Sequence, residues 1–179
     1  GRYELSGTKE NPAVKAGAVL TASSSSANMW YGLKKACQEV IKNNTEVKST
    51  MIYGCQWDET MSWLKRTKFV GEEEKVDEDS RSWGNYKDSI SPANVSGYGS
   101  KQDTGYSENW SANKIYDLAG NYRDYTQEAN SAYDRIYRGG YYGNSVSSEP
   151  GSDRYFNVPY SAFSSYTARA TLIISDTVS

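Results

Sequence analysis

The segment between Tyr122 and Tyr166 is built mainly from four residue types, which limits what the last third of the chain can form. It holds nine of the 16 Tyr with eight Ser, four Gly and three Asn, which together make 24 of its 45 residues. Tyr supplies a large amphipathic contact area and has few rotatable bonds, so it loses little conformational entropy on binding. Ser, Gly and Asn adapt their hydrogen bonding to the partner. Strand-like pieces interrupt the segment, so we expect a sheet that carries contact loops rather than a disordered tail.

The whole chain is predicted to form one α+β domain. Its 179 residues suffice for a single core, and we expect that domain to span residues 1–179. Apolar residues recur at helical spacing over 29–41, which predicts a first helix. A second helix is expected over about 58–66, with Trp57 or Trp63 in the core.

Short strands are expected at 3–6, 18–21, 50–53, 121–126, 135–138 and 169–174. The segment from Ala168 to Ile174 is the most hydrophobic of the chain, so it is predicted to be a central strand of the sheet. Residues 67–112 differ in character, because Glu, Asp, Gly, Ser and Asn dominate them. We interpret them as a loop-rich insertion that only covers the core.

Several classes of function are disfavoured by what the sequence lacks. His is absent, which removes the commonest general base and rules out Ser-His-Asp and Cys-His catalysis. A net charge of −2 and scattered basic residues do not favour nucleic acid as a partner. No apolar run approaches the roughly 20 residues that a membrane helix needs, so direct membrane insertion is not expected.

The two Cys and the first residue allow limited conclusions. Cys37 and Cys55 can form a disulfide, but two buried free thiols are the simpler interpretation. The chain begins at Gly1, without an initiator Met or a signal peptide, so we expect it to be excised from a longer protein.

Three motifs in the second half of the chain occur in a specific order. Residues 113–126 read NKIYDLAGNYRDYT, Arg135 opens RIYRGGYYGNS, and TARATLII lies near the end. With Gln56-Trp57-Asp58-Glu59 and Ser62-Trp63-Leu64 upstream, this run resembles the formylglycine-generating-enzyme branch of the C-type lectin fold from about residue 30 to 174. The resemblance implies two helices packed on a small, mainly antiparallel sheet with long loops and insertions.

The resemblance does not extend to the activity of those enzymes. They use a pair of Cys near the final strand for copper-thiolate chemistry, whereas this chain has Arg169-Ala170-Thr171 there. Cys37 and Cys55 lie far upstream. We therefore expect no catalytic residues and no enzymatic activity, because a fold does not by itself carry a function.

A second branch with this fold fits better: the variable proteins of diversity-generating retroelements, which include phage tail-tip receptor-binding proteins. In that family a template-driven process mutates adenines, most productively in Asn codons. The products include Tyr, Ser, Asp, Gly, Asn, Val, Phe, Ala and Thr, but not Lys, Trp, Met, Glu or Gln. Between Tyr141 and Tyr166 only Glu149 belongs to the excluded types. The resemblance therefore implies a variable region over residues 122–166.

This resemblance divides the region into two sets of residues. The framework positions would be Arg138, Gly139, Gly140, Pro150, Arg154, Pro159 and the strand from Ala168. The diversified ligand-binding positions would be Tyr122, Tyr141, Tyr142, Asn144, Val146, Asp153, Tyr155, Phe156, Val158, Tyr160, Ala162, Phe163, Ser164 and Ser165. Their alternation with framework residues over 154–160 would point alternate side chains outward, while Phe156 and Phe163 also fit a place in the core.

A calcium ion is also compatible with the resemblance. The enzyme branch binds calcium through backbone oxygens and an acid in the segment where Gly120, Tyr122 and Asp124 stand here. Calcium takes six to eight oxygen ligands, and a single carboxylate supplies few of them. We therefore favour a structural role for Asp124, capping a turn or pairing with Arg135 or Arg138, and expect no confident metal site and no cofactor.

The leading hypothesis is a non-catalytic, hypervariable module that binds a ligand or receptor. The resemblance places it on a phage virion, at the tail tip, or on a bacterial cell surface, with a protein or glycan receptor on a host or cell as partner. The alternatives are a fixed glycan-binding lectin-like domain and an enzyme of the formylglycine-generating type. A homo-oligomer would raise avidity.

Overall fold

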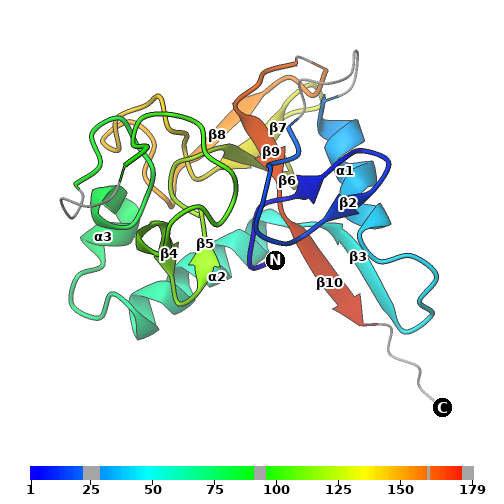
Figure 1. Ribbon diagram of the computed structural model, residues 1–179, viewed down its shortest axis with the longest axis horizontal. Coiled ribbons are helices and arrows are strands. Elements are labelled where there is room, and N and C mark those ends of the chain that lie inside the picture. Colours follow the sequence, from blue (N-terminus) through cyan, green and yellow to red (C-terminus); the bar gives the residue numbers. More distant parts are fainter. Residues whose placement is uncertain (22–28, 91–95, 161, 175–179) are drawn as a thin grey trace.

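The computed structural model describes residues 1–21, 29–90, 96–160 and 162–174. The fold combines one four-stranded sheet with several two-stranded pairs, and α1 lies on one side of the molecule while α3 and most of α2 lie on the other (Figure 1). Most of the strand pairs are antiparallel. This mixed architecture, with few helices and small sheets, is compatible with the expected C-type lectin-like fold.

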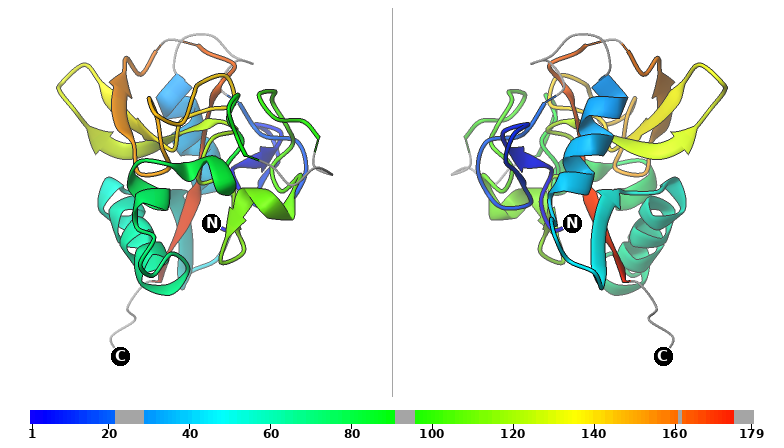
Figure 2. Two further views of the ribbon diagram at one scale, coloured as in Figure 1. Left: turned by 90° about the vertical axis from the view of Figure 1, so that its left-hand side faces the viewer. Right: turned by 90° about the vertical axis from the view of Figure 1, so that its right-hand side faces the viewer.

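Helix α1 (Met29–Glu39) forms where the apolar periodicity predicted it. Its buried residues include Met29, Leu33 and Cys37, which recur every four residues and so share one face. That face packs against β3 (Val47–Met51), next to which the helix lies in both side views (Figure 2). The helix ends two residues before the expected boundary.

Helix α2 (Gly54–Thr67) begins four residues earlier than expected. The side-chain oxygen of Gln56 accepts a hydrogen bond from the backbone N–H of Tyr53 at 3.1 Å, which fixes the first turn. Trp57 is fully buried while Trp63 is 38% exposed, so Trp57 is the core residue of the two. A short helix, α3 (Glu74–Asp77), follows.

The four-stranded sheet has the order β8-β7-β6-β9. Its strands are β6 (Arg123–Ala129), β7 (Arg135–Arg138), β8 (Arg154–Asn157) and β9 (Tyr166–Ala168). Strands β6 and β9 run parallel and the other pairs antiparallel. The strands predicted at 121–126 and 135–138 correspond to β6 and β7, whereas β8 and β9 were not predicted.

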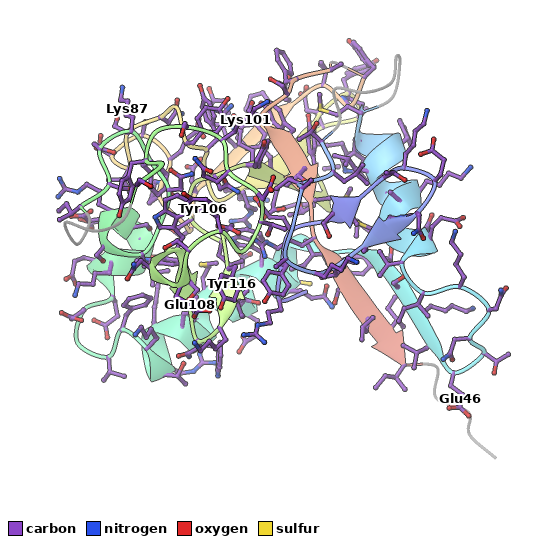
Figure 3. All side chains as sticks on the ribbon, in the orientation of Figure 1. Glu46, Lys87, Lys101, Tyr106, Glu108 and Tyr116 are labelled. Atoms are coloured by element: carbon purple, nitrogen blue, oxygen red, sulfur yellow. The ribbon has the colours of Figure 1, made fainter. Side chains whose placement is uncertain are left out.

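The last strand, β10 (Ala170–Ile174), pairs with β3 in a two-stranded ribbon that starts in the core and whose far end projects from the rest of the molecule (Figure 1). Glu46, just before β3, lies at the far end of this ribbon (Figure 3). Leu172 and Ile174 are 57% and 74% exposed. The prediction of a central strand is therefore wrong, because hydrophobicity reports how apolar a segment is and not how many strands pair with it.

The N-terminal segment contains less regular structure than expected. Its strands are β1 (Ser6–Gly7) and β2 (Pro12–Ala13), and residues 18–21 contribute only a bridge between Val19 and Ser6. The strand expected at 50–53 is β3, which starts and ends earlier. A further hairpin is formed by β4 (Ser111–Ala112) and β5 (Ile115–Tyr116).

Two hydrophobic cores hold these elements together. The first core contains Leu5, Leu20, Met29, Trp30, Leu33, Ala36, Cys37, Met51, Tyr125, Tyr137, Tyr166, Ala168 and Ala170. The second core contains Ile52, Trp57, Met61, Leu64, Phe69, Val76, Trp83, Tyr86, Ala112, Leu118, Ala119 and Val146. Because several members of the second core come from residues 67–112, this loop-rich segment supplies part of the core and does not merely cover it.

The two cysteines are free: Cys37 is buried and Cys55 is exposed. The expectation of two buried thiols therefore holds only for Cys37, whose pKa is raised by burial. In the part of the chain that the structure describes, no helix is both long and apolar enough to cross a bilayer.

Candidate ligand-binding surface

Large aromatic side chains are exposed on β8 and on the segment that follows it. Tyr155, Phe156, Tyr160 and Phe163 are 55%, 43%, 61% and 46% exposed. The rings of Tyr155 and Phe156 stack with their centroids 5.1 Å apart and their planes within 13°. We call these four residues the aromatic surface. Neither Phe lies in the core, which was the alternative that the sequence left open.

The position of β8 explains why neighbouring side chains are exposed together. It is an edge strand that pairs only with β7, and Arg154, Tyr155 and Phe156 are all exposed. The expected alternation of inward and outward side chains is therefore wrong at these residues. Alternation buries every second residue only where one face of a strand is well covered, and here the contact of the Tyr155 ring with that of Tyr137, 5.9 Å between centroids, leaves Tyr155 55% exposed.

Beneath the aromatic surface, Arg123 on β6 is enclosed by aromatic rings. Its guanidinium carbon lies 4.0 Å from the ring centroid of Tyr141, 5.1 Å from that of Tyr137 and 5.3 Å from that of Tyr166. The same guanidinium donates two hydrogen bonds to Glu149, at 2.8 and 2.5 Å. These contacts fasten the loop between β7 and β8 to the sheet.

Arg123 was not among the predicted site residues, although the sequence held a signal for its partner. Glu149 is the residue of 141–166 that adenine mutagenesis of Asn codons does not produce. Its side chain is 12% exposed and that of Arg123 is 13% exposed, so the pair is shielded from solvent. An acid in a segment otherwise rich in Tyr, Ser, Gly and Asn calls for a basic partner, and in the structure that partner is Arg123.

The predicted framework residues support the same loop. The buried Arg138 side chain donates to Asp58 at 2.7 Å and to the backbone oxygen of Ser152 at 3.2 Å. Gly140 has a φ of 69°, and a Cβ there would lie 2.3 Å from the backbone oxygen of Glu149. Any side chain at residue 140 would therefore push the loop away from the sheet.

Two of the predicted ligand-binding residues are buried. Val146 is 3% exposed and packs in the second core, and its backbone N–H donates to Asp88 at 3.0 Å. Because the side chain of Val146 is covered by other core residues, a ligand cannot contact it, and Val146 is corrected to a core residue. Tyr122 is 6% exposed and meets the ring of Tyr142 edge to face, with the centroids 6.1 Å apart.

The remaining predicted residues differ in exposure. Ala162 and Ser164 are exposed, while the half-buried residues are Tyr141, Tyr142, Asn144, Asp153, Val158 and Ser165. Burial raises the pKa of the Asp153 carboxyl, with nearby Glu149 raising it further. The backbone oxygen of Ser165 accepts a hydrogen bond from the backbone N–H of Arg123 at 2.9 Å, so the end of the Tyr-rich segment is also bonded to β6.

A groove of about 400 Å³ is lined both by residues of the Tyr-rich segment 122–166 and by residues of the loop around 101–106. Tyr122 and Ser164 line it on one side, and Lys101, Asp103 and Tyr106 line it on the other. Figure 3 shows Lys101 and Tyr106 on the loop-rich side of the molecule. These loop residues were not predicted as site residues, and no local pattern relates them to the Tyr-rich segment.

The contacts of Asp124 do not fit a calcium ligand. Its carboxylate accepts a hydrogen bond from Nε of Arg169 at 2.6 Å, and both side chains are 1% exposed. The predicted pairing with Arg135 or Arg138 is therefore wrong, since the partner is Arg169. A guanidinium against the carboxylate opposes a second cation there. Within residues 1–21, 29–90, 96–160 and 162–174, no three His, Cys, Asp or Glu are grouped to hold a metal.

Comparisons with known proteins place this geometry among solved folds. No protein-family model matches the chain, and no curated protein matches it in sequence. The crystal structure of CarF aligns over 80% of this chain and 53% of its own, with a TM-score of 0.53 and 14% identity. For Treponema denticola variable protein 1 the coverage is 78% and 52%, the TM-score 0.47 and the identity 14%.

The chain thus spans about half the length of both of these proteins. At 14% identity the likeness to CarF concerns the fold and not the activity. The chain shares its fold with CarF, and the resemblance to the retroelement variable proteins with a C-type lectin fold is confirmed at the level of the fold.

Proposed function

We propose that this chain is a non-catalytic module that binds a macromolecular receptor through the aromatic surface. The observation that carries this proposal is the exposure of Tyr155, Phe156, Tyr160 and Phe163 within nine residues of sequence, outside both cores. Neighbouring exposed aromatic side chains on a folded protein are typical of interaction sites. Tyr and Phe also bury large areas at low entropic cost when a partner covers them.

The support beneath the surface favours the same function. Arg123, Glu149 and Arg138 hold the loop that leads into β8, the strand that carries Tyr155 and Phe156, so a partner would meet these two rings on a supported strand. Preorganisation of this kind lowers the entropic cost of binding. We infer further that a retroelement diversifies the exposed positions and that the module acts on a virion tail tip or a bacterial surface.

A protein receptor is favoured over a glycan by the extent of the surface. The exposed aromatic residues run from the edge strand β8 to residue 163, and the groove beside Ser164 lengthens the contact region. Protein interfaces use aromatic anchors surrounded by adaptable polar residues, here Ser and Asn. A sugar needs only one or two rings on which to stack.

The test measures binding of the fluorescently labelled protein to a panel of bacterial cells by flow cytometry. On any strain that binds, Tyr155→Ala and Tyr160→Ala are each expected to weaken binding about tenfold or more, as is usual for aromatic anchors. The matched control is Tyr133→Ala, because Tyr133 is 76% exposed but lies outside the aromatic surface. Circular dichroism of each variant establishes that folding is intact.

Either of two results would count against the proposal. If Tyr155→Ala and Tyr160→Ala bind as well as the parent, the contact surface lies elsewhere. If protease treatment of the cells leaves binding unchanged while glycosidase treatment removes it, the receptor is a glycan and the lectin alternative holds.

A further inference from the structure

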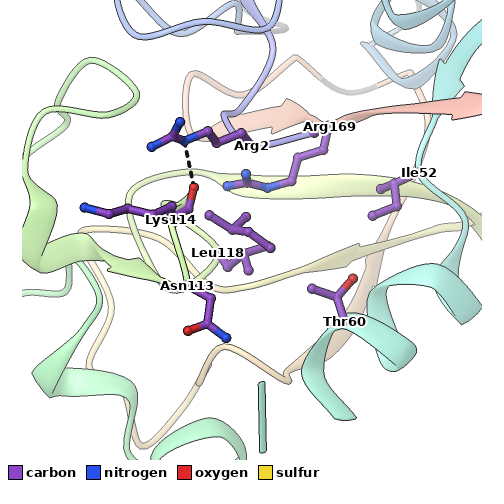
Figure 4. A pocket seen from close by; sticks show the side chains of 9 residues that line it. Arg2, Ile52, Thr60, Asn113, Lys114, Leu118 and Arg169 are labelled. Atoms are coloured by element: carbon purple, nitrogen blue, oxygen red, sulfur yellow. Dashed lines mark hydrogen bonds between the residues drawn. The ribbon is translucent and has the colours of Figure 1, made fainter. Parts of the chain in front are cut away.

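A cavity of about 380 Å³ lies between α2, the β4–β5 hairpin and the start of β10 (Figure 4). None of the residues that line it belongs to the aromatic surface. Three basic side chains contribute to its wall, from Arg2, Lys114 and Arg169. The remaining lining residues are Gly1, Ile52, Thr60, Asn113, Ile115 and Leu118, and among the described residues that line it there is no Asp or Glu.

Arg169 is the buried basic residue among those that line this cavity. Its side chain is 1% exposed, and only its Nε is bonded, to Asp124. In the described part of the chain, its two terminal nitrogens have no hydrogen-bond partner. Figure 4 shows the guanidinium reaching into the space beside Arg2, Lys114 and Leu118. Each buried donor left unpaired costs about 1–3 kcal/mol, so a group that accepts hydrogen bonds is expected there.

The other two basic residues are held at the cavity by contacts that leave their charge in place. Arg2 donates through Nε to the backbone oxygen of Lys114 at 2.9 Å, and its guanidinium lies over the ring of Tyr116. Lys114 pairs with Glu108 at 2.7 Å, but both side chains are largely exposed, so solvent screens this pair. Basic side chains therefore stand at both the buried wall and the rim of the cavity, while Asp124 and Glu108 pair with two of them from outside the cavity lining.

The acidic groups near Arg169 lie beyond the cavity. Asp124 binds Nε, and Glu4 and Asp117 are buried side chains that do not line the cavity. Water in the cavity would supply acceptors for the terminal nitrogens, but it would bring no negative charge. An oxyanion supplies both, and a guanidinium binds two of its oxygens at once with its parallel N–H groups.

We propose that this cavity binds a small oxyanion, a phosphate or carboxylate group held by the two terminal nitrogens of Arg169 and attracted by Arg2 and Lys114. A volume of about 380 Å³ is at the low end for ligand pockets, which suits a small anion and its immediate substituent. Ile52, Ile115 and Leu118 offer an apolar wall to that substituent. The site is independent of the receptor-binding surface.

The experiment titrates the whole chain with inorganic phosphate and, separately, with acetate, against chloride at the same ionic strength. Isothermal calorimetry and thermal unfolding are the readouts, because a ligand that binds only the folded state raises the melting temperature in a saturable way. We expect saturable binding of at least one of the two anions. Phosphate binding without acetate binding would assign the site to phosphoryl groups, and the reverse to carboxylates.

Variants then locate the binding. Thr60 lines the cavity from α2, and its hydroxyl already donates within the helix to Gln56 at 2.7 Å. Thr60→Leu therefore fills part of the cavity with little cost to folding and is expected to abolish binding. Lys114→Gln is expected to weaken binding about threefold to fivefold, as for a partly screened charge. Lys87→Gln, which removes an exposed charge that does not line the cavity, is the matched control.

Arg169 itself is a poor test position, because its removal strands Asp124 in the interior and threatens folding. The proposal is overturned if neither anion shows saturable binding. It is also overturned if Thr60→Leu and Lys114→Gln bind the anion as tightly as Lys87→Gln, since the binding would then lie elsewhere or reflect a general salt effect.

Discussion

Asp124→Ala is expected to lower the free energy of unfolding by about 3–5 kcal/mol, the usual cost of removing one partner of a buried ion pair. Asp124 and Arg169 are each 1% exposed, so removing the carboxylate leaves the Arg169 guanidinium buried without its anionic partner. The pair also joins β6 to the residue that precedes β10, and its loss affects both sheets. Urea unfolding followed by circular dichroism measures the change.

The control for this prediction is an ion pair of similar length at the surface. Arg66 and Glu59 are 2.8 Å apart and 61% and 73% exposed. Glu59→Ala is expected to change the free energy of unfolding by less than about 1 kcal/mol. If Asp124→Ala does not unfold the chain more easily than Glu59→Ala, the buried pair is not the structural tie that its geometry indicates. Should Asp124→Ala fail to fold at all, the milder variant Asp124→Asn is measured in its place, and its loss of unfolding free energy is expected to be smaller.

The free energy of unfolding is expected to fall as the pH rises from about 4 to 6, because of buried carboxyls. Burial raises the pKa of Asp117 to about 6 from the ordinary 3.8, although hydrogen bonds from Gly105 and Thr104 oppose it. Between these values the folded chain binds more protons than the unfolded chain. The stabilising contribution of protonated Asp117 is thus fully present when the pH is below the pKa of the unfolded chain. It is lost as the pH rises through the pKa of the folded chain, and the loss is on the order of 3 kcal/mol for this group.

Asp117→Asn isolates the contribution of this residue. An Asn oxygen can accept the same hydrogen bonds from Thr104 at 3.0 Å and Gly105 at 2.8 Å. It also tolerates the φ of 57° found there. The variant is expected to match the parent near pH 4 and to be more stable by roughly 2–3 kcal/mol near pH 6.5. Urea unfolding across this range checks it, and a difference that does not change with pH would contradict the assigned cause.

Local sequence patterns predicted the elements that depend on neighbours along the chain. The spacing of Met29, Leu33 and Cys37 identified α1, because helix amphipathicity is a local property. The start of α2 was missed by four residues, since it depends on the hydrogen bond from Tyr53 to Gln56 and not on apolar spacing. Of the strands predicted at 121–126 and 135–138, the second matches β7 in both bounds, whereas β6 is shifted to Arg123–Ala129.

Pairing across long sequence separations could not be predicted in the same way. The partner of Asp124 is 45 residues away, while the nearer Arg135 and Arg138 have other contacts. Likewise, an apolar composition did not reveal that β10 has a single neighbouring strand. For the candidate site, composition indicated the Tyr-rich segment, but only the fold separates exposed Tyr155 from buried Tyr122 and Val146.

The separation of the aromatic surface from both cores bears on how this chain can change through evolution or in the laboratory. Substitutions at residues 155, 156, 160 and 163 remove no member of either core, and surface substitutions usually change stability by less than about 0.5 kcal/mol. Arg123, Glu149 and Arg138 meanwhile hold the loop that leads into β8. A randomised library at those four positions would therefore sample new specificities on a scaffold that tolerates most of its members.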